Sequence, residues 1–381
     1  MWRATITYEA RRVPDHDSKA AVTLDPTDRA AALHDAGMTL HDGGRLREAR
    51  ASCRKALALF ERHSGRSHPD VANVLLELAA IARELGDYGE GLRDARRALA
   101  ILAPRRGDMV FDQLRVQALG RIGELHVARG EYELAEAPLR RAVNIAKQEL
   151  GEDELATAMN GLAVVYKYTS RFNEAGRLYR SALAITKRTQ GPNACAVASI
   201  LHNLGGLEHS RGRFAKGEPF ARRSVAIRER ALGANHPDVA ADVAALAALL
   251  DGQGTPRKRK EAEVLYRRAI DVFRRRFGRA HFEVGFNLGQ LAALCHQSDR
   301  AGEASRLYRR AVAIQEEALG RRHPVLALTL MNFAALRRDQ GRTAEAEGLY
   351  RQAHAIYRVA LGPKHAETTA CAAAHAKLIG G

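Results

Sequence analysis

Histidine and cysteine side chains are the first candidates for chemistry in this chain of 381 residues, which has 15 histidines and four cysteines. Two pairs lie close in sequence: Cys295 precedes His296 directly, and Cys371 precedes His375 by four positions. Each pair offers two ligands, whereas a structural zinc site usually has four. The chain has no C-x-x-C pair, and most histidines stand where helices are expected to begin. We therefore expect no metal and no cofactor, and we interpret the cysteines as small buried hydrophobic residues.

Sequence patterns of catalytic sites are also missing. The chain has no G-x-x-x-x-G-K-S/T phosphate loop, no H-E-x-x-H zinc helix and no G-x-S-x-G nucleophile turn. The glycine pairs at 43–44 and 205–206 fall at a turn and at a helix-packing position, which disfavours a nucleotide role. An enzyme would need a further catalytic domain in a larger polypeptide or a neighbouring protein. We predict that this chain is not an enzyme.

The charge of the chain is strongly positive. Lys and Arg number 60 against 44 Asp and Glu, a formal net charge of +16. Such a surface favours acidic partners electrostatically. However, 50 of the basic residues are Arg and only 10 are Lys, a bias that a GC-rich genome produces through codon usage alone. The charge by itself therefore does not indicate nucleic-acid binding.

The elements that must position these residues follow a repeat of about 42 residues. Glycines that end apolar helical runs recur at steps of 40 to 45 residues, at Gly65, Gly107, Gly151, Gly191, Gly233, Gly278, Gly320 and Gly362. Several are followed by His-Pro or a remnant of it, such as HPDVA at 68 and at 236. A fixed period of 20 to 50 residues is typical of a solenoid.

Each repeat contains two amphipathic helical patterns separated by a short turn such as Gly212-Arg213-Phe214. The first pattern has an apolar stripe, and the second has a small residue, a Tyr four positions on and another small residue three positions later. The clearest examples are Ala175, Tyr179 and Ala182; Ala262, Tyr266 and Ala269; Ala304, Tyr308 and Ala311; and Ala346, Tyr350 and Ala353. These spacings place the three residues on one helix face, where we expect close helix packing.

This pattern of two helices with a Leu-Gly or Leu-Ala pair and an Ala-x3-Tyr-x2-Ala signature resembles the tetratricopeptide repeat. The repeat length and the Ala-Leu-Gly followed by His-Pro-Asp-Val-Ala resemble the kinesin light chain type in particular. The resemblance implies an all-α, right-handed superhelical solenoid of about eight helix-turn-helix repeats with a C-terminal capping helix.

We expect two regions along the chain. Residues 1–25 lack helical periodicity and are interpreted as a flexible N-terminal arm. Residues 26–379 form the solenoid, with units at about 26–67, 68–109, 110–151, 152–192, 193–235, 236–280, 281–322 and 323–364 and a cap at 365–379.

A solenoid of this kind has an extended concave face lined by its first helices. Register within the repeats places seven polar residues on that face: Asn160, Lys167, His202, Asn203, His209, Asn332 and Arg338. The resemblance implies that the Asn residues hold a peptide backbone and that Lys or Arg holds acidic side chains or a terminal carboxylate. Only one Asn of each pair in the family pattern remains here. The alternative interpretation is a solvated polar helix face.

The second helices carry a basic stripe, defined by Arg222, Arg223, Arg267, Arg268, Arg309 and Arg310. The stripe could neutralise nucleic-acid phosphates. A solvated surface in an Arg-rich chain is the favoured interpretation, because the neighbouring tyrosines are needed for packing and cannot stack on bases. Arg257 to Lys260 resembles a nuclear-localisation run, and an inserted surface loop would explain it as well.

We predict a non-catalytic scaffold or adaptor for protein–protein interaction that binds a peptide segment, with an acidic segment favoured, in its concave groove. The alternative is a nucleic-acid-binding protein that uses the basic stripe. No apolar run approaches the roughly 20 residues of a membrane-spanning helix, so no membrane partner is expected. The charged N-terminus does not resemble a signal peptide, which makes the cytoplasm the expected location.

Overall fold

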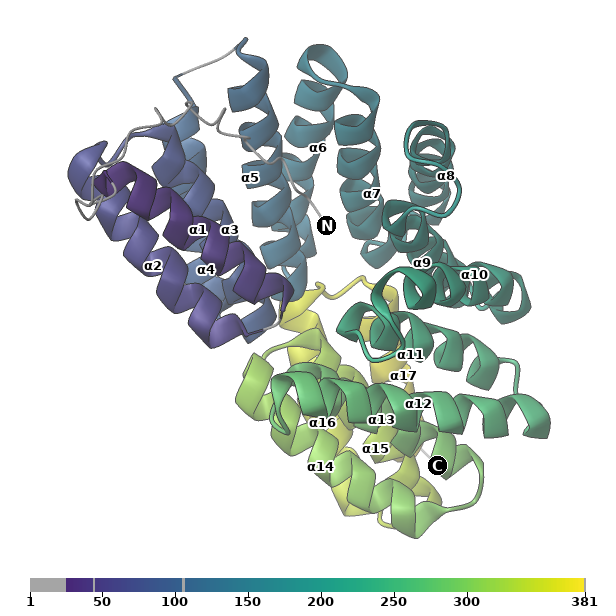
Figure 1. The fold of residues 1–381 in the computed structure, drawn as a ribbon. Helices are drawn as coiled ribbons and strands as arrows, with labels where there is room; N and C mark the ends of the chain where they lie inside the picture. The colour runs from purple at the N-terminus through teal and green to yellow at the C-terminus, as the bar shows by residue number, and fades with distance from the viewer. Residues whose placement is uncertain (1–24, 44, 105–106, 380–381) are drawn as a thin grey trace. The chain divides into compact units, whose positions relative to one another are not determined.

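The structure is a computed structural model that describes residues 25–43, 45–104 and 107–379. Within these ranges the chain forms seventeen α-helices and no β-strand (Figure 1). The helices are α1 (Pro26–Asp42), α2 (Leu46–His63), α3 (Pro69–Leu85), α4 (Tyr88–Leu102), α5 (Met109–Ala128), α6 (Tyr132–Glu149), α7 (Glu152–Tyr168), α8 (Phe172–Thr189), α9 (Cys195–Ser210), α10 (Phe214–Leu232), α11 (Pro237–Gly252), α12 (Pro256–Phe277), α13 (Phe282–Gln297), α14 (Ala301–Leu319), α15 (Pro324–Asp339), α16 (Thr343–Ala360) and α17 (Ala366–Ile379).

Consecutive helices form hairpins. The first and second helices of a repeat pack against each other in α1–α2, α3–α4, α9–α10, α11–α12, α13–α14 and α15–α16, and α17 packs on α16. The predicted all-α repeat solenoid with a capping helix is therefore confirmed. The predicted arm, residues 1–25, lies outside the described residues except for Asp25, whose side chain caps α1.

The chain divides into two compact units. Unit 1 comprises Met1–Leu125 and Pro138–Glu154, and unit 2 comprises His126–Ala137 and Leu155–Gly381. In unit 2 the hairpins from α9 to α16 follow one another, and their first helices contact each other in the order α9, α11, α13, α15. These first helices thus form one continuous layer.

The His-Pro signature has a structural role at the start of the first helices. In each of five repeats the histidine Nδ1 atom accepts the backbone N–H of the residue two positions on, at 3.1 to 3.4 Å. These residues are His68, His236, His281, His323 and His365. An N-terminal cap of this kind satisfies a backbone donor that the helix leaves unpaired. The histidines are therefore explained without a catalytic or metal-binding role.

The turns inside the hairpins need a left-handed residue, and glycine usually supplies it. Gly130, Gly212 and Gly341 have φ angles of 73°, 68° and 73°. Two turns use another residue instead: Ser170 has a φ of 60° and Asp299 has a φ of 57°. Left-handed backbone is uncommon for residues other than glycine. These two turns consequently carry a side chain where the other turns carry none.

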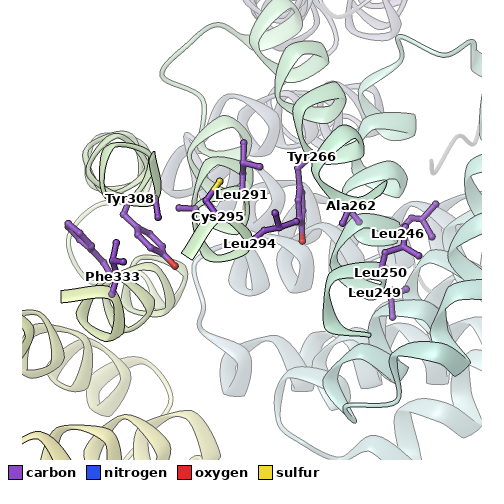
Figure 2. Packing of buried hydrophobic residues seen from close by; sticks show 14 of the residues in the cluster. Leu246, Leu249, Leu250, Ala262, Tyr266, Leu291, Leu294, Cys295, Tyr308 and Phe333 are labelled. Carbon is purple, nitrogen blue, oxygen red and sulfur yellow. The ribbon is translucent and has the colours of Figure 1, made fainter. Parts of the chain in front are cut away.

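The small residues and tyrosines of the second helices form the core, as predicted. Tyr179, Tyr308 and Tyr350 are at most 1% exposed, and the flanking alanines are fully buried. Figure 2 shows the row of side chains that runs through the second half of unit 2, in which Tyr266 lies beside Leu294 and Tyr308 lies beside Phe333. The Tyr308 and Phe333 rings stack with centroids 5.3 Å apart.

Three of the four cysteines, Cys53, Cys295 and Cys371, are buried, whereas Cys195 is half-buried. All four are free thiols.

The basic run Arg257 to Lys260 is not an inserted loop, since Pro256 starts α12 and the Thr255 side chain caps that helix. Among the described residues, no helix combines the length and the apolar character that a membrane span requires.

Candidate functional site on the first helices of unit 2

The first helices of unit 2 bring part of the predicted groove together. The Asn203 side chain of α9 donates a hydrogen bond from Nδ2 to Oδ1 of Asn160 on α7, at 3.0 Å. The Lys167 side chain of α7 reaches α9. A Cβ atom placed on Gly206 of α9 would lie 3.6 Å from the Lys167 Nζ atom. The Lys167 ammonium also lies 4.4 Å from the centroid of the Tyr168 ring, a cation–π contact.

His202 of the predicted set belongs to a network that the sequence analysis missed. Its Nδ1 atom lies 2.7 Å from Oδ1 of Asp242 on α11, and that carboxylate is completely buried. Asp242 also accepts hydrogen bonds from Arg228 at 2.9 Å and from the Ser224 hydroxyl at 2.7 Å, both on α10. A buried carboxylate is stable only when it is paired and hydrogen-bonded in this way. The network therefore fixes the position of the His202 ring.

One sequence signal could have revealed Asp242. It is the only acidic residue between Asp238 and Asp251 in an otherwise apolar helix, and it occupies the repeat position of the buried Ile200. An isolated charge on the packing side of such a helix needs a partner on a neighbouring element.

The other predicted groove residues are less closely associated. His209 is exposed at the end of α9, where its ring meets the edge of Phe214 at a centroid distance of 5.2 Å. Asn332 is half-buried on α15, and Arg338 of the same helix is paired with its neighbour Asp339 at 2.8 Å. The structure thus groups Asn160, Lys167, His202 and Asn203, and places the two α15 residues further along the layer.

The first helices of unit 1 carry a different set of side chains. His41 of α1 contacts two carboxylates of α3, with Nδ1 2.6 Å from Glu77 and Nε2 3.2 Å from Glu84. Burial lowers the pKa of His41, but the hydrogen bonds to Glu77 and Glu84 outweigh it and raise the pKa to about 9. Because His41, Glu77 and Glu84 pair with one another, this cluster offers a ligand fewer unpaired polar groups than the amides of unit 2 do.

Half of the basic stripe is paired with acidic residues of neighbouring repeats. Arg222 pairs with Glu261 at 2.7 Å, Arg268 with Glu229 at 2.5 Å, and Arg267 with Glu303 at 3.2 Å. Each pair joins the second helices of two adjacent repeats. The remaining residues of the stripe are exposed and have no ion-pair partner within the described ranges; they are Arg223, Arg309 and Arg310.

The two Cys-His pairs do not form metal sites. Cys295 is buried in the core, while the His296 Nε2 atom lies 3.0 Å from Asp339. The Cys371 thiol donates to the backbone oxygen of Tyr350 at 3.6 Å. In the part of the chain that the structure describes, no three His, Cys, Asp or Glu side chains are grouped to hold a metal ion.

Comparison with family models identifies the class of protein. One tetratricopeptide repeat model matches residues 28–103, 114–188 and 257–317, and a second matches residues 197–238 and 326–367. The matched residues cover more than half of the chain, and the chain therefore belongs to the tetratricopeptide repeat family. Repeats of this family generally form non-catalytic scaffolds for protein–protein interaction.

Curated relatives support the kinesin light chain type. The protein kinesin light chain-related 2 of Arabidopsis thaliana is 26% identical over 230 residues, which are 58% of this chain and 34% of that protein. The clustered mitochondria protein homolog of Homo sapiens is 25% identical over 195 residues, 51% of this chain and 15% of that protein. The chain thus spans about a third or less of the length of these relatives.

Solved structures show the same fold at low sequence identity. A Rap protein complexed with the competence and sporulation factor has a TM-score of 0.60 and 12% identity, covering 93% of this chain and 98% of that one. The Rap conjugation regulator of plasmid pLS20 in complex with a Phr peptide has a TM-score of 0.57 and 15% identity, covering 89% and 98%.

Proposed function

We propose that unit 2 binds an extended peptide segment of a protein partner along the layer of first helices. The observation that carries this proposal is the amide pair of Asn160 and Asn203, which lies beside Lys167. After their mutual hydrogen bond, the two amides retain N–H donors and a carbonyl acceptor. A peptide backbone offers the complementary acceptors and donors at every residue.

The network around Asp242 supports this role through preorganisation. It holds the His202 ring by a hydrogen bond to Nδ1, so that the Nε2 atom remains for a ligand. A partly exposed ring fixed in advance loses little conformational entropy when a ligand binds. The solved structures of the same fold include one with a Phr peptide, which agrees with a peptide as the ligand class.

An acidic segment is the favoured ligand. Lys167 supplies a positive charge beside the amide pair, and the chain has a formal net charge of +16. The positive electrostatic potential of these charges raises the association rate of acidic peptides more than it raises their final affinity.

The proposal is tested by selecting peptides from a random phage-displayed library on the full chain. The double variant Asn160→Ala, Asn203→Ala is expected to lose at least tenfold in affinity for the selected peptides. The matched control is Asn144→Ala, which removes an exposed amide from the second helix α6. Equal binding by the double variant and the wild type would contradict the proposed groove, and selected peptides without acidic residues would contradict the charge preference.

Nucleic acid is the second candidate ligand, because Arg223, Arg309 and Arg310 remain exposed and without an ion-pair partner in the described ranges. Changing all three to Gln would then abolish binding of a fluorescent DNA duplex and reduce its salt dependence. The same variant is expected to bind the selected peptides as the wild type does.

A further inference from the structure

A repeated ion pair marks the turn at the start of the second helices, and it is missing at one place. In five repeats an Arg stands immediately before the second helix: Arg45, Arg171, Arg213, Arg300 and Arg342. In four of them a Glu three positions later accepts hydrogen bonds from it or forms an ion pair with it; the acceptors are Glu48, Glu174, Glu303 and Glu345. After Arg213 the corresponding residue is Lys216.

The second carboxylate of this arrangement is also missing at Arg213. Arg171 reaches back to Glu136 of the preceding repeat at 2.8 Å, and Arg300 reaches back to Glu263 at 2.8 Å. Both Glu residues directly follow the first buried alanine of their second helix. At the same position in α8 the chain has Gly176, which follows the buried Ala175. Arg213 therefore lacks both of the carboxylates that pair with Arg171 and Arg300 in their repeats.

Positive charge gathers at this point instead. Arg213 and Lys216 are exposed, and within the described ranges neither has an ion-pair partner. Residues three apart lie on the same side of a helix, so the two charges face the same region. A Cβ atom on Gly176 would lie 3.3 Å from Nη1 of Arg180 and 3.7 Å from Nη2 of Arg211. Guanidinium groups thus flank the position at which the other two repeats carry a Glu side chain.

A shallow depression of about 390 Å³ opens here, and we call it the Arg213 depression. Its lining residues are Ser170, Phe172, Asn173, Ser210, Arg211 and Arg213. None of the six is acidic. The nearby carboxylates are already paired, Glu208 with Arg211 at 3.0 Å and Glu174 with Arg171 at 2.7 Å.

Further donors point to the chemistry of the ligand. Arg211 donates to Oδ1 of Asn173 at 3.1 Å, which fixes that amide so that its NH₂ group remains available. Ser170 adds a hydroxyl at a turn position where most of the other described repeats have glycine. A guanidinium, an amide NH₂ and a hydroxyl together can bind a tetrahedral dianion that has several oxygen acceptors. A single carboxylate would leave most of these donors unused.

We propose that the Arg213 depression binds a phosphate monoester on a protein partner, of the kind that phosphoserine presents. A nucleotide is disfavoured because the only aromatic ring in the lining is Phe172, and the Arg211 guanidinium lies over it at 6.0 Å. This contact occupies one face of the ring on which a base would have to stack. The site lies at the turns between first and second helices, and none of its lining residues belongs to the residues predicted for the peptide groove.

The experiment measures binding of the peptide Gly-Gly-phosphoserine-Gly-Gly to the full chain by isothermal titration calorimetry at constant ionic strength. The unphosphorylated peptide is expected to bind at least tenfold more weakly. Lys216→Glu restores the Arg-x-x-Glu pair of the other turns and should reduce binding tenfold or more. Gly176→Glu restores the second carboxylate and should have the same effect, with circular dichroism confirming that the helices are retained.

The matched control is Lys187→Glu, which makes the same charge change at an exposed position near the other end of α8. It is expected to change the affinity less than threefold. The proposal is overturned if Lys187→Glu weakens binding as much as Lys216→Glu, or if Lys216→Glu binds the phosphopeptide normally. Tighter binding of adenosine monophosphate than of the phosphopeptide would overturn the assignment to a protein partner.

Discussion

The Arg213 depression has a counterpart two repeats further along unit 2, at the turn before α14. This second depression, here called the Arg300 depression, also measures about 390 Å³. It lies at the same place in the hairpin, yet its lining includes the carboxylates Glu263 and Asp299 among the basic residues. Arg300 donates to both oxygens of Glu263, at 2.9 and 2.8 Å.

Three repeat positions around the two turns differ in charge. Near Arg300 they hold Glu303, Glu263 and Asp299, whereas near Arg213 they hold Lys216, Gly176 and Gly212. One solenoid frame can therefore use the same surface either as an ion pair that joins adjacent repeats or as a cationic site that remains open to a ligand.

The largest expected effect concerns the frame that the two depressions share. Tyr179 of α8 and Tyr266 of α12 are at most 2% exposed in equivalent positions beneath them. Replacing either by Ala leaves a large cavity, and each variant should lose about 3–5 kcal/mol of stability. Urea denaturation followed by circular dichroism measures both. A clearly smaller loss at one site would show that the two repeats do not share the same packing.

Tyr179→Phe is the control for this prediction. The Tyr179 hydroxyl is buried and has no hydrogen-bond partner within the described ranges. Its removal should change the stability by no more than about 1 kcal/mol, in the stabilising direction, because an unsatisfied polar group is removed.

A smaller effect distinguishes the two arginines. Arg300→Ala breaks two charge-assisted hydrogen bonds to Glu263 of the preceding repeat, and we expect a loss of about 1 kcal/mol, since the pair is partly exposed. Arg213→Ala should change the stability by less than about 0.5 kcal/mol. Thermal denaturation of both variants against the wild type makes the comparison. Equal losses would mean that Arg213 has a structural partner after all.

The smallest expected effect is on the pH dependence of stability. Hydrogen bonds from Arg300 lower the pKa of Glu263, burial opposes them, and Arg267 lowers the pKa further. A carboxyl whose folded pKa is lowered stabilises the protein above its ordinary pKa of about 4.5, and this contribution is lost as the pH falls through the lowered value.

Glu263→Gln should therefore reduce the loss of stability between pH 7 and pH 3.5, by about 0.5 kcal/mol. Denaturation midpoints at the two pH values measure the difference. Glu317→Gln, at an exposed position on α14, is the control and should follow the wild type. An unchanged acid sensitivity in Glu263→Gln would mean that the Arg300 pair does not contribute to stability.

Much of the fold follows from the sequence because the same local signals for a helical hairpin recur in every repeat. Glycine spacing, His-Pro helix starts and the Ala-x3-Tyr-x2-Ala face each depend on residues within one hairpin. These signals predict the all-α solenoid and its buried tyrosines, such as Tyr179 and Tyr308, without any long-range information.

The candidate sites depended on contacts between repeats, and there the sequence alone was less informative. Register placed Asn160 and Asn203 on the groove face, and the structure shows that a hydrogen bond joins them. It could not reveal that Asp242 orders His202, or that Arg222 is neutralised by Glu261 across 39 residues. Ion pairing depends on distances of a few ångströms between side chains of separate helices.

The sequence by itself thus determined the helical repeat and the residue types that are buried in each hairpin, because periodicity is a local property. Only the tertiary structure decided which charges are satisfied. Arg213 and Arg300 both stand immediately before a second helix, and their difference appears when Glu263 and Gly176 of the preceding repeats are placed beside them. Whether a charge is available to a ligand depends on its neighbours in space, which the order of residues along one helix does not specify.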